Sequence, residues 1–268
     1  MTYETIDLVI DESVATLKLK RPDRYNALNS QMLDELIDAL QHLQSSDEAR
    51  ALVLTGEGRA FCSGADLAGG SDGKKPTPHE RAEAVRHSMH LKFNPVIKKI
   101  AVLNIPTIAA VNGVAAGGGV GLALCCDLVI ATPEVKFILV FTPKLGLIPD
   151  LGSAWHYVRA LGRQRTMAAA YFGTPISAEE ALKDGLIWKM VPGEDLLVEA
   201  THTAAALAKG PTRAFPATRA SIDAASQQTL FEQLDMEAEM QPALIATDDY
   251  AEGVRAFLQK RDPVFKGE

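Results

Sequence analysis

Two short turns rich in glycine and other small residues follow apolar strand patterns, and at these turns the backbone itself can do chemistry. One lies in VNGVAAGGGVGLALCCDLVIAT, residues 111–132, and the other in GEGRAFCSGADLAGG, residues 56–70. Glycine lets backbone N–H groups approach a ligand closely, and two converging N–H groups stabilise an oxyanion. The first turn supplies one side of such a hole, and Ser63–Ala65 in the second exposes backbone for the other. The alternative is that both are ordinary tight turns between a strand and a helix.

The glycine cluster does not match the common phosphate-binding motifs. A dinucleotide fingerprint that starts at Gly117 needs a glycine where Leu122 stands, and no Gly-Lys-Ser/Thr follows as in a P-loop. GGSDG, residues 69–73, matches G-x-S-x-G, but a nucleophile elbow must lie between a strand and a helix. This match lies inside a Gly- and Pro-rich surface loop, residues 68–80, so we interpret it as chance.

Composition and charge narrow the class of protein. The chain of 268 residues is 47% hydrophobic and carries a net charge of -7, which argues against a nucleic-acid-binding protein. It shows no secretory signal and no apolar run long enough to cross a bilayer, so we expect no membrane association. Three cysteines, Cys62, Cys125 and Cys126, fit reduced thiols in a cytoplasmic protein. His87 and His90 share a helix face without further ligands, so we expect no metal site.

Apolar runs of strand length alternate with helical patterns along most of the chain, which predicts an α/β fold. The strand patterns are Ile6–Ile10, Val14–Leu19, Ala51–Thr55, Thr107–Val111, Leu128–Ala131 and Leu186–Val191. One helical pattern begins after Asn29 or Ser30, and a second runs from Glu80 to Leu103. A third runs to Gly185 from Ser177, its N-cap, with Glu180 at the capping-box position. Only helical patterns follow, at residues 197–209, 212–226, 230–247 and 249–260. We therefore expect a main body, residues 1–198, and a helical C-terminal region, residues 199–268.

Several motifs, in this order, resemble those of the crotonase, or enoyl-CoA hydratase/isomerase, superfamily. They are RPDRYNALN, RAFCSGADL, IAAVNGVAAGGGVGLALCCDLVIAT, TPISAEEALKDGLIWKMV and DYAEGVRAFLQKRDPVFKG, which together cover essentially the whole chain. The resemblance implies a crotonase-like spiral of repeated ββα units and a helical C-terminal region that forms trimers or hexamers. RALVLTG, PTIAAVNG and CDLVIAT are weak internal repeats of the kind that such a spiral requires.

The resemblance also implies an acyl-CoA substrate, of which coenzyme A is a part, so no separate cofactor is expected. Matched by motif, the N–H groups of Ala65 and Gly118 hold the thioester oxygen, where an enolate places its negative charge. Losing one such donor typically costs about 3–4 kcal/mol of transition-state stabilisation. Asp66 is expected to fix the turn that carries Ala65.

Further substrate contacts follow from the same motifs. Arg24 and Ala27 match the segment that lies along coenzyme A, and Phe257 and Lys260 match residues that reach the coenzyme A of a neighbouring subunit. The alternative for these four is an ordinary surface or helix-face position. The other residues expected around the substrate are Ser63, Leu67, Gly117, Phe141, Leu145 and Trp155.

Hydratases of the superfamily use two glutamates to activate water and to protonate the α-carbon. The resemblance places them at Gly121 and Phe141, so neither carboxyl group is present. The next acid is Asp150, in KLGLIPDLGSAW, which resembles the ring-1,2-epoxyphenylacetyl-CoA isomerases, where this aspartate faces the substrate. A single carboxylate suits an isomerase, because one base in an apolar pocket can take a proton and return it to another carbon. The alternative for Asp150 is a helix N-cap.

Three functions therefore stay open. The first is an acyl-CoA isomerase that moves a double bond or rearranges a ring epoxide, with Asp150 as base, acid or positioning group. The second is an enoyl-CoA hydratase-type lyase that recruits another acid, such as Asp72 or Glu80. The third is a crotonase-fold protein that binds acyl-CoA without catalysis. The acyl group and the choice between trimer and hexamer do not follow from the sequence.

Overall fold

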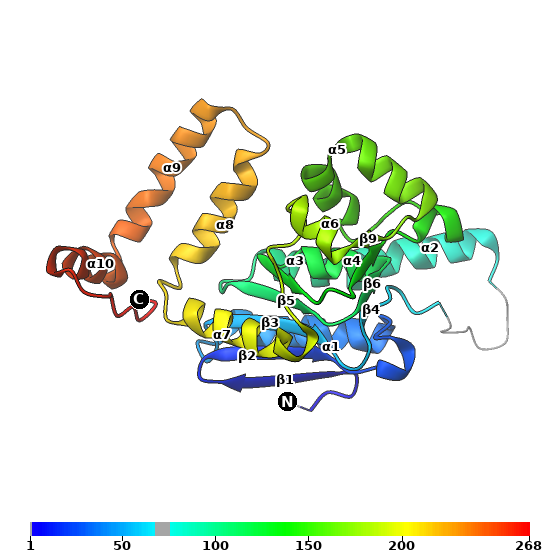
Figure 1. The fold of residues 1–268 in the computed structure, drawn as a ribbon, viewed down its shortest axis with the longest axis horizontal. Helices are drawn as coiled ribbons and strands as arrows, with labels where there is room; N and C mark the ends of the chain where they lie inside the picture. The colour runs from blue at the N-terminus through cyan, green and yellow to red at the C-terminus, as the bar shows by residue number, and fades with distance from the viewer. Residues whose placement is uncertain (1, 68–75) are drawn as a thin grey trace.

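The computed structural model describes residues 2–67 and 76–268, and its strands form two sheets (Figure 1). The six-stranded sheet has the order β1 (Ile6–Asp11), β2 (Val14–Leu19), β3 (Ala51–Gly56), β5 (Thr107–Val111), β7 (Leu128–Ala131) and β10 (Lys189–Met190). The four-stranded sheet has the order β4 (Ala60–Cys62), β6 (Val114–Ala116), β8 (Lys136–Ile138) and β9 (Ile176–Ser177). Strands β1 and β2 are antiparallel, whereas β2, β3, β5 and β7 run parallel to one another.

Repeated strand-strand-helix units build the body of the molecule, as the family resemblance implied. In the pairs β3–β4, β5–β6 and β7–β8, the first strand joins the larger sheet and the second joins the smaller one. The helices that follow these pairs are α2 (Pro78–Ser88) with α3 (Asn94–Ala101), α4 (Gly118–Leu124), and α5 (Ser153–Phe172). The predicted α/β spiral is therefore confirmed. The strands of the smaller sheet were not predicted, because two or three residues are too short to show an alternating pattern.

The helical predictions hold with small differences. Helix α1 (Ser30–Ser45) begins at Asn29, whose side chain accepts a hydrogen bond from the N–H of Met32. The pattern predicted as one helix up to Leu103 is α2, a π-helical turn (Met89–Phe93) and α3. Pro95 stands at the start of α3 and has no N–H to donate to the preceding turn.

The predicted strand Leu186–Val191 forms only in its second part. Lys189–Met190 pairs with β7, and the N–H groups of the flanking Trp188 and Val191 donate to the carbonyl oxygens of Val129 and Ala131. Leu186 and Ile187 are buried in the main hydrophobic cluster, so their apolar character reflects packing and not a strand. The preceding helix α6 (Ala178–Lys183) begins with the predicted capping box, in which Ser177 and Glu180 bond each other's backbone N–H.

The C-terminal helices divide into one that covers the larger sheet and three that extend from it. Helix α7 (Leu196–Ala208) packs on β3 and β5. The predicted boundary between the main body and the C-terminal region, at residue 198, falls inside this helix and stays a prediction. Helices α8 (Ala214–Ala225), α9 (Leu230–Ile245) and α10 (Asp248–Gln259) form an arm that leads away from the body (Figure 1). No residue of α8 or α9 is buried within the described chain. None of the described helices has the length and apolar composition needed to span a bilayer.

Candidate active site

The two small-residue turns meet at one edge of the smaller sheet. Strands β4 and β6 are parallel neighbours, so the segments that follow them leave the sheet on the same side. A methyl group on Gly64 would lie 3.0 Å from the amide nitrogen of Gly118, so the turns are in direct contact. Gly64 and Gly117 have φ values of +94° and +53°, which favour glycine. The structure therefore brings together the turns that the sequence singled out.

The N–H groups of Ala65 and Gly118 are available to a ligand. Gly118 is the first residue of α4, so its N–H has no intrahelical acceptor. Ala65 forms a parallel bridge with Leu28, in which the flanking residues make the hydrogen bonds. The Leu28 N–H donates to the Gly64 carbonyl oxygen (2.8 Å), and the Asp66 N–H donates to the Leu28 carbonyl oxygen (3.0 Å). The Ala65 N–H then points away from Leu28, and within residues 2–67 and 76–268 neither amide has an acceptor.

Asp150 lies beside Gly118, on the turn that precedes α5. Leu151 and Gly152 have φ values of +50° and +80°, and this turn brings the carboxyl group to the start of α4. A methyl group on Gly118 would lie 3.6 Å from Oδ1 of Asp150. That oxygen is buried and has no hydrogen-bond partner among the described residues. Burial raises the pKa of Asp150 to about 6, against an opposing backbone hydrogen bond. A carboxyl group with this pKa can accept and release a proton near neutral pH.

The Asp150 side chain is not the cap of α5. The N-cap position is occupied by Gly152, so no side chain caps the helix. Ser153 donates its N–H (3.0 Å) and its hydroxyl (2.6 Å) to the backbone carbonyl oxygen of Asp150, which leaves the carboxyl group out of the capping contacts. The alternative that Asp150 serves as the helix N-cap is therefore wrong.

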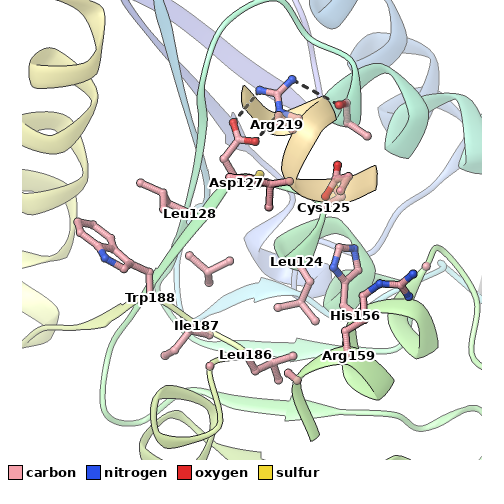
Figure 2. Close-up of a pocket in the computed structure, with 18 of the residues that line it drawn as sticks. Leu124, Cys125, Asp127, Leu128, His156, Arg159, Leu186, Ile187, Trp188 and Arg219 are labelled. Carbon is pink, nitrogen blue, oxygen red and sulfur yellow. Dashed lines mark hydrogen bonds and ion pairs between the residues drawn. The ribbon is translucent and has the colours of Figure 1, made fainter. Parts of the chain in front are cut away.

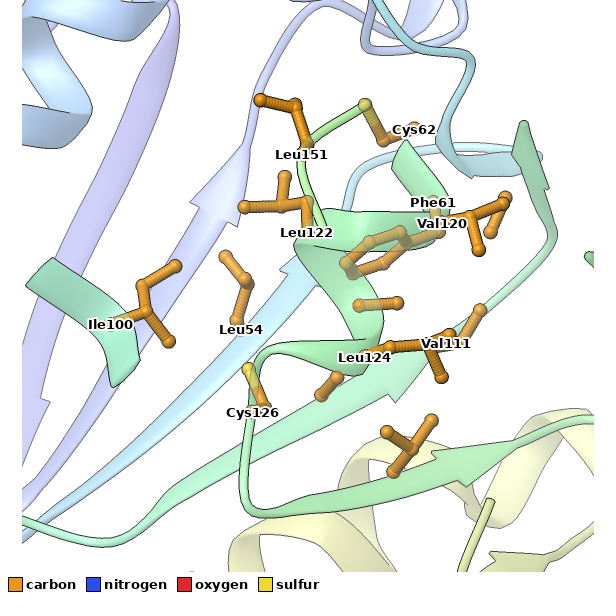
Figure 3. Packing of buried hydrophobic residues seen from close by; sticks show 14 of the residues in the cluster. Leu54, Phe61, Cys62, Ile100, Val111, Val120, Leu122, Leu124, Cys126 and Leu151 are labelled. Atoms are coloured by element: carbon orange, nitrogen blue, oxygen red, sulfur yellow. The ribbon is translucent and has the colours of Figure 1, made fainter. Parts of the chain in front are cut away.

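The positions assigned to the hydratase glutamates, Gly121 and Phe141, hold no carboxyl group. At position 121 the backbone of a neighbouring turn leaves no room for a side chain. A methyl group on Gly121 would lie only 2.2 Å from the carbonyl oxygen of Leu151. Leu151 lies beside Cys62 at the edge of the packed cluster that holds α4 (Figure 3). Phe141 is buried in the same cluster. A side chain at position 121 would therefore displace the turn that carries Asp150.

The segment with Arg24 and Ala27 runs along the turn of Ser63. The Ser63 N–H donates to the Tyr25 carbonyl oxygen (3.0 Å), and its hydroxyl donates to the Arg24 carbonyl oxygen (3.5 Å). The Arg24 side chain is exposed and Ala27 is buried. Arg59, which the sequence analysis did not single out, lies with its guanidinium carbon 4.4 Å from the centre of the Tyr25 ring. The backbone of Arg24 and Tyr25 therefore flanks the turn of Ser63, and Arg59 stacks on the Tyr25 ring.

Asp66 ends this turn and is held by a residue that the sequence analysis missed. Its Oδ2 lies 2.8 Å from Nη2 of Arg21. The two residues are 45 positions apart, so no local spacing indicates that they pair. Leu67, the next residue, is 72% exposed.

Four other candidate residues lie on elements outside the two turns. Trp155 lines a cavity of about 1020 Å³ between the body and α8, and Figure 2 shows other residues of its lining. Leu145 is 42% exposed on a π-helical turn (Phe141–Leu145). Phe257 and Lys260 are exposed at the end of α10, far along the arm from β4 and β6 (Figure 1).

Of the two acids proposed for a hydratase mechanism, only Glu80 lies among the described residues. Asp72 and the GGSDG segment lie outside the described residues. Glu80 closes a capping box at the start of α2, where its carboxylate accepts hydrogen bonds from the N–H and hydroxyl of Thr77 (2.7 and 2.8 Å). These bonds lower the pKa of Glu80. Among the residues that the structure describes, no cluster of histidine, cysteine and acidic side chains has the arrangement of a metal site.

Comparisons with known proteins agree with this architecture. Residues 9–268 match the family described as Enoyl-CoA hydratase/isomerase. A Rhodobacter capsulatus protein named "Probable enoyl-CoA hydratase" is 43% identical over the full length of both chains. The 1,2-epoxyphenylacetyl-CoA isomerase of Escherichia coli K12 is 41% identical, over 97% of each chain. The crystal structure of an enoyl-CoA hydratase from Bacillus anthracis superposes with a TM-score of 0.87 at 33% identity, covering 99% of this chain and 100% of that one. The chain therefore belongs to the enoyl-CoA hydratase/isomerase family of the crotonase superfamily.

Proposed function

We propose that the protein is an acyl-CoA isomerase in which the amides of Ala65 and Gly118 hold the thioester oxygen and Asp150 moves the proton. The observation that carries this proposal is the Asp150 carboxyl group. Its Oδ1 is buried beside Gly118 without a hydrogen-bond partner among the described residues. An unpartnered buried oxygen is costly for stability, so a functional role explains its retention better than a structural one.

The chemistry follows from the position of these groups. With a 3-enoyl thioester bound, the two amides stabilise negative charge on the carbonyl oxygen, which acidifies the C–H bonds of the α-carbon. The Asp150 carboxylate takes one of these protons, and the electron pair spreads over a dienolate. The protonated Asp150 then returns the proton to the γ-carbon, which leaves a double bond conjugated with the thioester. One carboxyl group with a pKa of about 6 serves both steps.

A ring epoxide is the second substrate class for this site. The isomerase from Escherichia coli is named for a 1,2-epoxyphenylacetyl-CoA substrate, and we carry that substrate class over to this chain as a proposal. The dearomatised ring would rearrange to a seven-membered oxepin. Asp150 would then donate a proton or position the ring.

Hydration of an enoyl-CoA is the alternative function, and the name of the relative from Rhodobacter capsulatus favours it. The two-glutamate mechanism requires a second carboxyl group, whereas Gly121 has no room for a side chain and Glu80 is engaged in its capping box. Acyl-CoA binding without catalysis is the remaining alternative.

We also propose that copies of the chain associate as a trimer or a hexamer. Helices α8 and α9 expose large apolar side chains such as Ile222 (67%), Phe231 (78%) and Leu234 (51%), which burial against other copies would remove from water. In such an assembly, Phe257 and Lys260 would reach the coenzyme A of a neighbouring subunit. A cytoplasmic location and the lack of a separate cofactor stay predictions.

A substrate panel tests the proposed function. The purified protein is assayed with a trans-3-enoyl-CoA, a trans-2-enoyl-CoA and a ring-epoxide aryl-acetyl-CoA. Isomerisation raises the near-ultraviolet absorbance as the double bond becomes conjugated, whereas hydration of the 2-enoyl thioester lowers it. We expect turnover of the first or third substrate and none of the second. Fast hydration with no isomerisation would replace the proposal by the hydratase alternative.

A further inference from the structure

The Arg21 side chain joins both sides of the bridge that carries Ala65. Its Nη2 donates to Oδ2 of Asp66 (2.8 Å), and its Nη1 donates to the backbone carbonyl oxygen of Ala27 (2.5 Å). Asp66 follows Ala65 directly, and Ala27 precedes Leu28, the residue that pairs with Ala65. One planar guanidinium group therefore holds the two segments side by side.

We propose that Arg21, acting through Asp66, is a positioning residue that fixes the direction of the Ala65 N–H, an inference that rests on the proposed function. The bridge hydrogen bonds use the Gly64 carbonyl oxygen and the Asp66 N–H, so the Ala65 N–H is left on the opposite side. A small rotation of the Gly64–Asp66 segment would turn that N–H away from the thioester oxygen. The ion pair opposes such a rotation because it anchors Asp66 at its side chain as well as at its backbone.

The surroundings of the pair suit a rigid contact. The side chains of Arg21 and Asp66 are only 17% and 13% exposed, so solvent screens their attraction weakly. Arginine presents donors in a fixed planar fork, whereas the single ammonium group of lysine makes a poorer match to two acceptors on different segments. The geometry therefore favours arginine specifically at this position.

The backbone of Arg21 is itself anchored to the smaller sheet. Asn26 is fully buried, and its side-chain oxygen accepts a hydrogen bond from the Arg21 N–H (2.9 Å). The Asn26 amide donates to the carbonyl oxygens of Glu57 (3.0 Å) and Ala60 (2.8 Å), and Ala60 begins β4. A continuous set of contacts thus connects β4 through Asn26 and Arg21 to Asp66.

The test measures carbonyl polarisation directly. A 2,4-dienoyl-CoA is mixed with the wild-type protein and with the variants Arg21→Gln, Arg21→Lys and Asp66→Asn, and the absorbance spectrum of the bound thioester is recorded. Two amides that polarise the carbonyl shift this absorbance to longer wavelength. We expect a clear shift with the wild-type protein, a lost or strongly reduced shift with Arg21→Gln and Asp66→Asn, and an intermediate shift with Arg21→Lys. In isomerisation, kcat should fall at least 10-fold in Arg21→Gln. The pKa of Asp150 that the pH profile reports should be the same as in the wild-type protein.

The control variant is Arg219→Gln, which removes a comparable ion pair away from the turns. Arg219 pairs with Asp127 at 11% and 23% exposure and donates to the carbonyl oxygens of Leu103 and Ile105. The Arg219→Gln substitution should lower the stability of the protein and leave the spectral shift of the bound thioester at the wild-type value. A wild-type shift and kcat in folded Arg21→Gln and Asp66→Asn would overturn the positioning role alone. No shift with the wild-type protein would overturn the oxyanion hole, and the positioning role with it. Asp66→Asn preserves side-chain shape, so it serves if Arg21→Gln does not fold.

Discussion

The contact between Gly121 and Leu151 makes a quantitative prediction about Asp150. In Gly121→Ala, the new methyl group would lie 2.2 Å from the carbonyl oxygen of Leu151, whereas an ordinary contact begins at 3.4 Å, so the two atoms must separate by more than 1 Å. The fully buried helix α4 has little room to yield, so the turn that carries Asp150 must move. A displacement of about 1 Å in a reacting group reduces turnover about 100-fold.

Steady-state isomerisation of a trans-3-enoyl-CoA is the assay for this variant, and calorimetric titration with a non-reactive acyl-CoA analogue reports binding. We expect kcat to fall about 100-fold, with a smaller change in the affinity for the analogue. Gly193→Ala is the matched control, because its nearest neighbouring atom is Cγ2 of Thr132, at 4.0 Å, and its φ is not positive. A folded Gly121→Ala protein with wild-type kcat would refute the argument that this contact holds Asp150 in place.

Three further predictions concern Asp150 and the arm. The kcat/KM of isomerisation should rise with pH through about 6 and then level off, because the carboxylate form of Asp150 is the base; a flat profile from pH 5 to 8 would contradict this. The pKa of Asp150 is raised in the folded state above its ordinary 3.8, so the folded protein holds the extra proton. Its contribution to stability should therefore be present below pH about 4 and be lost as the pH rises through about 6, and thermal unfolding of Asp150→Asn should lack this component. Phe231→Glu, which charges the exposed face of α9, should lower the mass measured by light scattering, and an unchanged mass would exclude α9 from the subunit interface.

The longer elements and the order of the motifs could be predicted from the sequence because they carry local signals. Helix α1 shows its cap at Asn29 and an apolar face at helical spacing, and the fully buried strands β3 and β5 are continuous apolar runs. The smaller sheet gives no such signal, although its strands β4 and β6 place the two turns together. Its strands are recognised only by their pairing partners, which are distant in sequence.

The part of the candidate site that could be predicted from the sequence is the part that depends on residue type alone. Asp150 stands out as an acid in an otherwise apolar stretch, but its buried oxygen beside Gly118 depends on two successive positive φ values that the sequence does not display. Arg21 was not identified from the sequence because its proposed role depends on a contact with Asp66, which lies 45 residues away in the chain. Long-range hydrogen bonds of this kind become visible only when the chain is folded.

The most direct test of the account is the turnover of Asp150→Asn with a trans-3-enoyl-CoA. Asparagine keeps the shape of the side chain and removes the group that accepts the proton. The account predicts that kcat falls by a factor of about 10² to 10⁴, the usual contribution of a positioned acid or base, while binding of the acyl-CoA analogue stays near the wild-type value. Isomerisation by Asp150→Asn at the wild-type rate would contradict the assignment of Asp150 as the proton carrier.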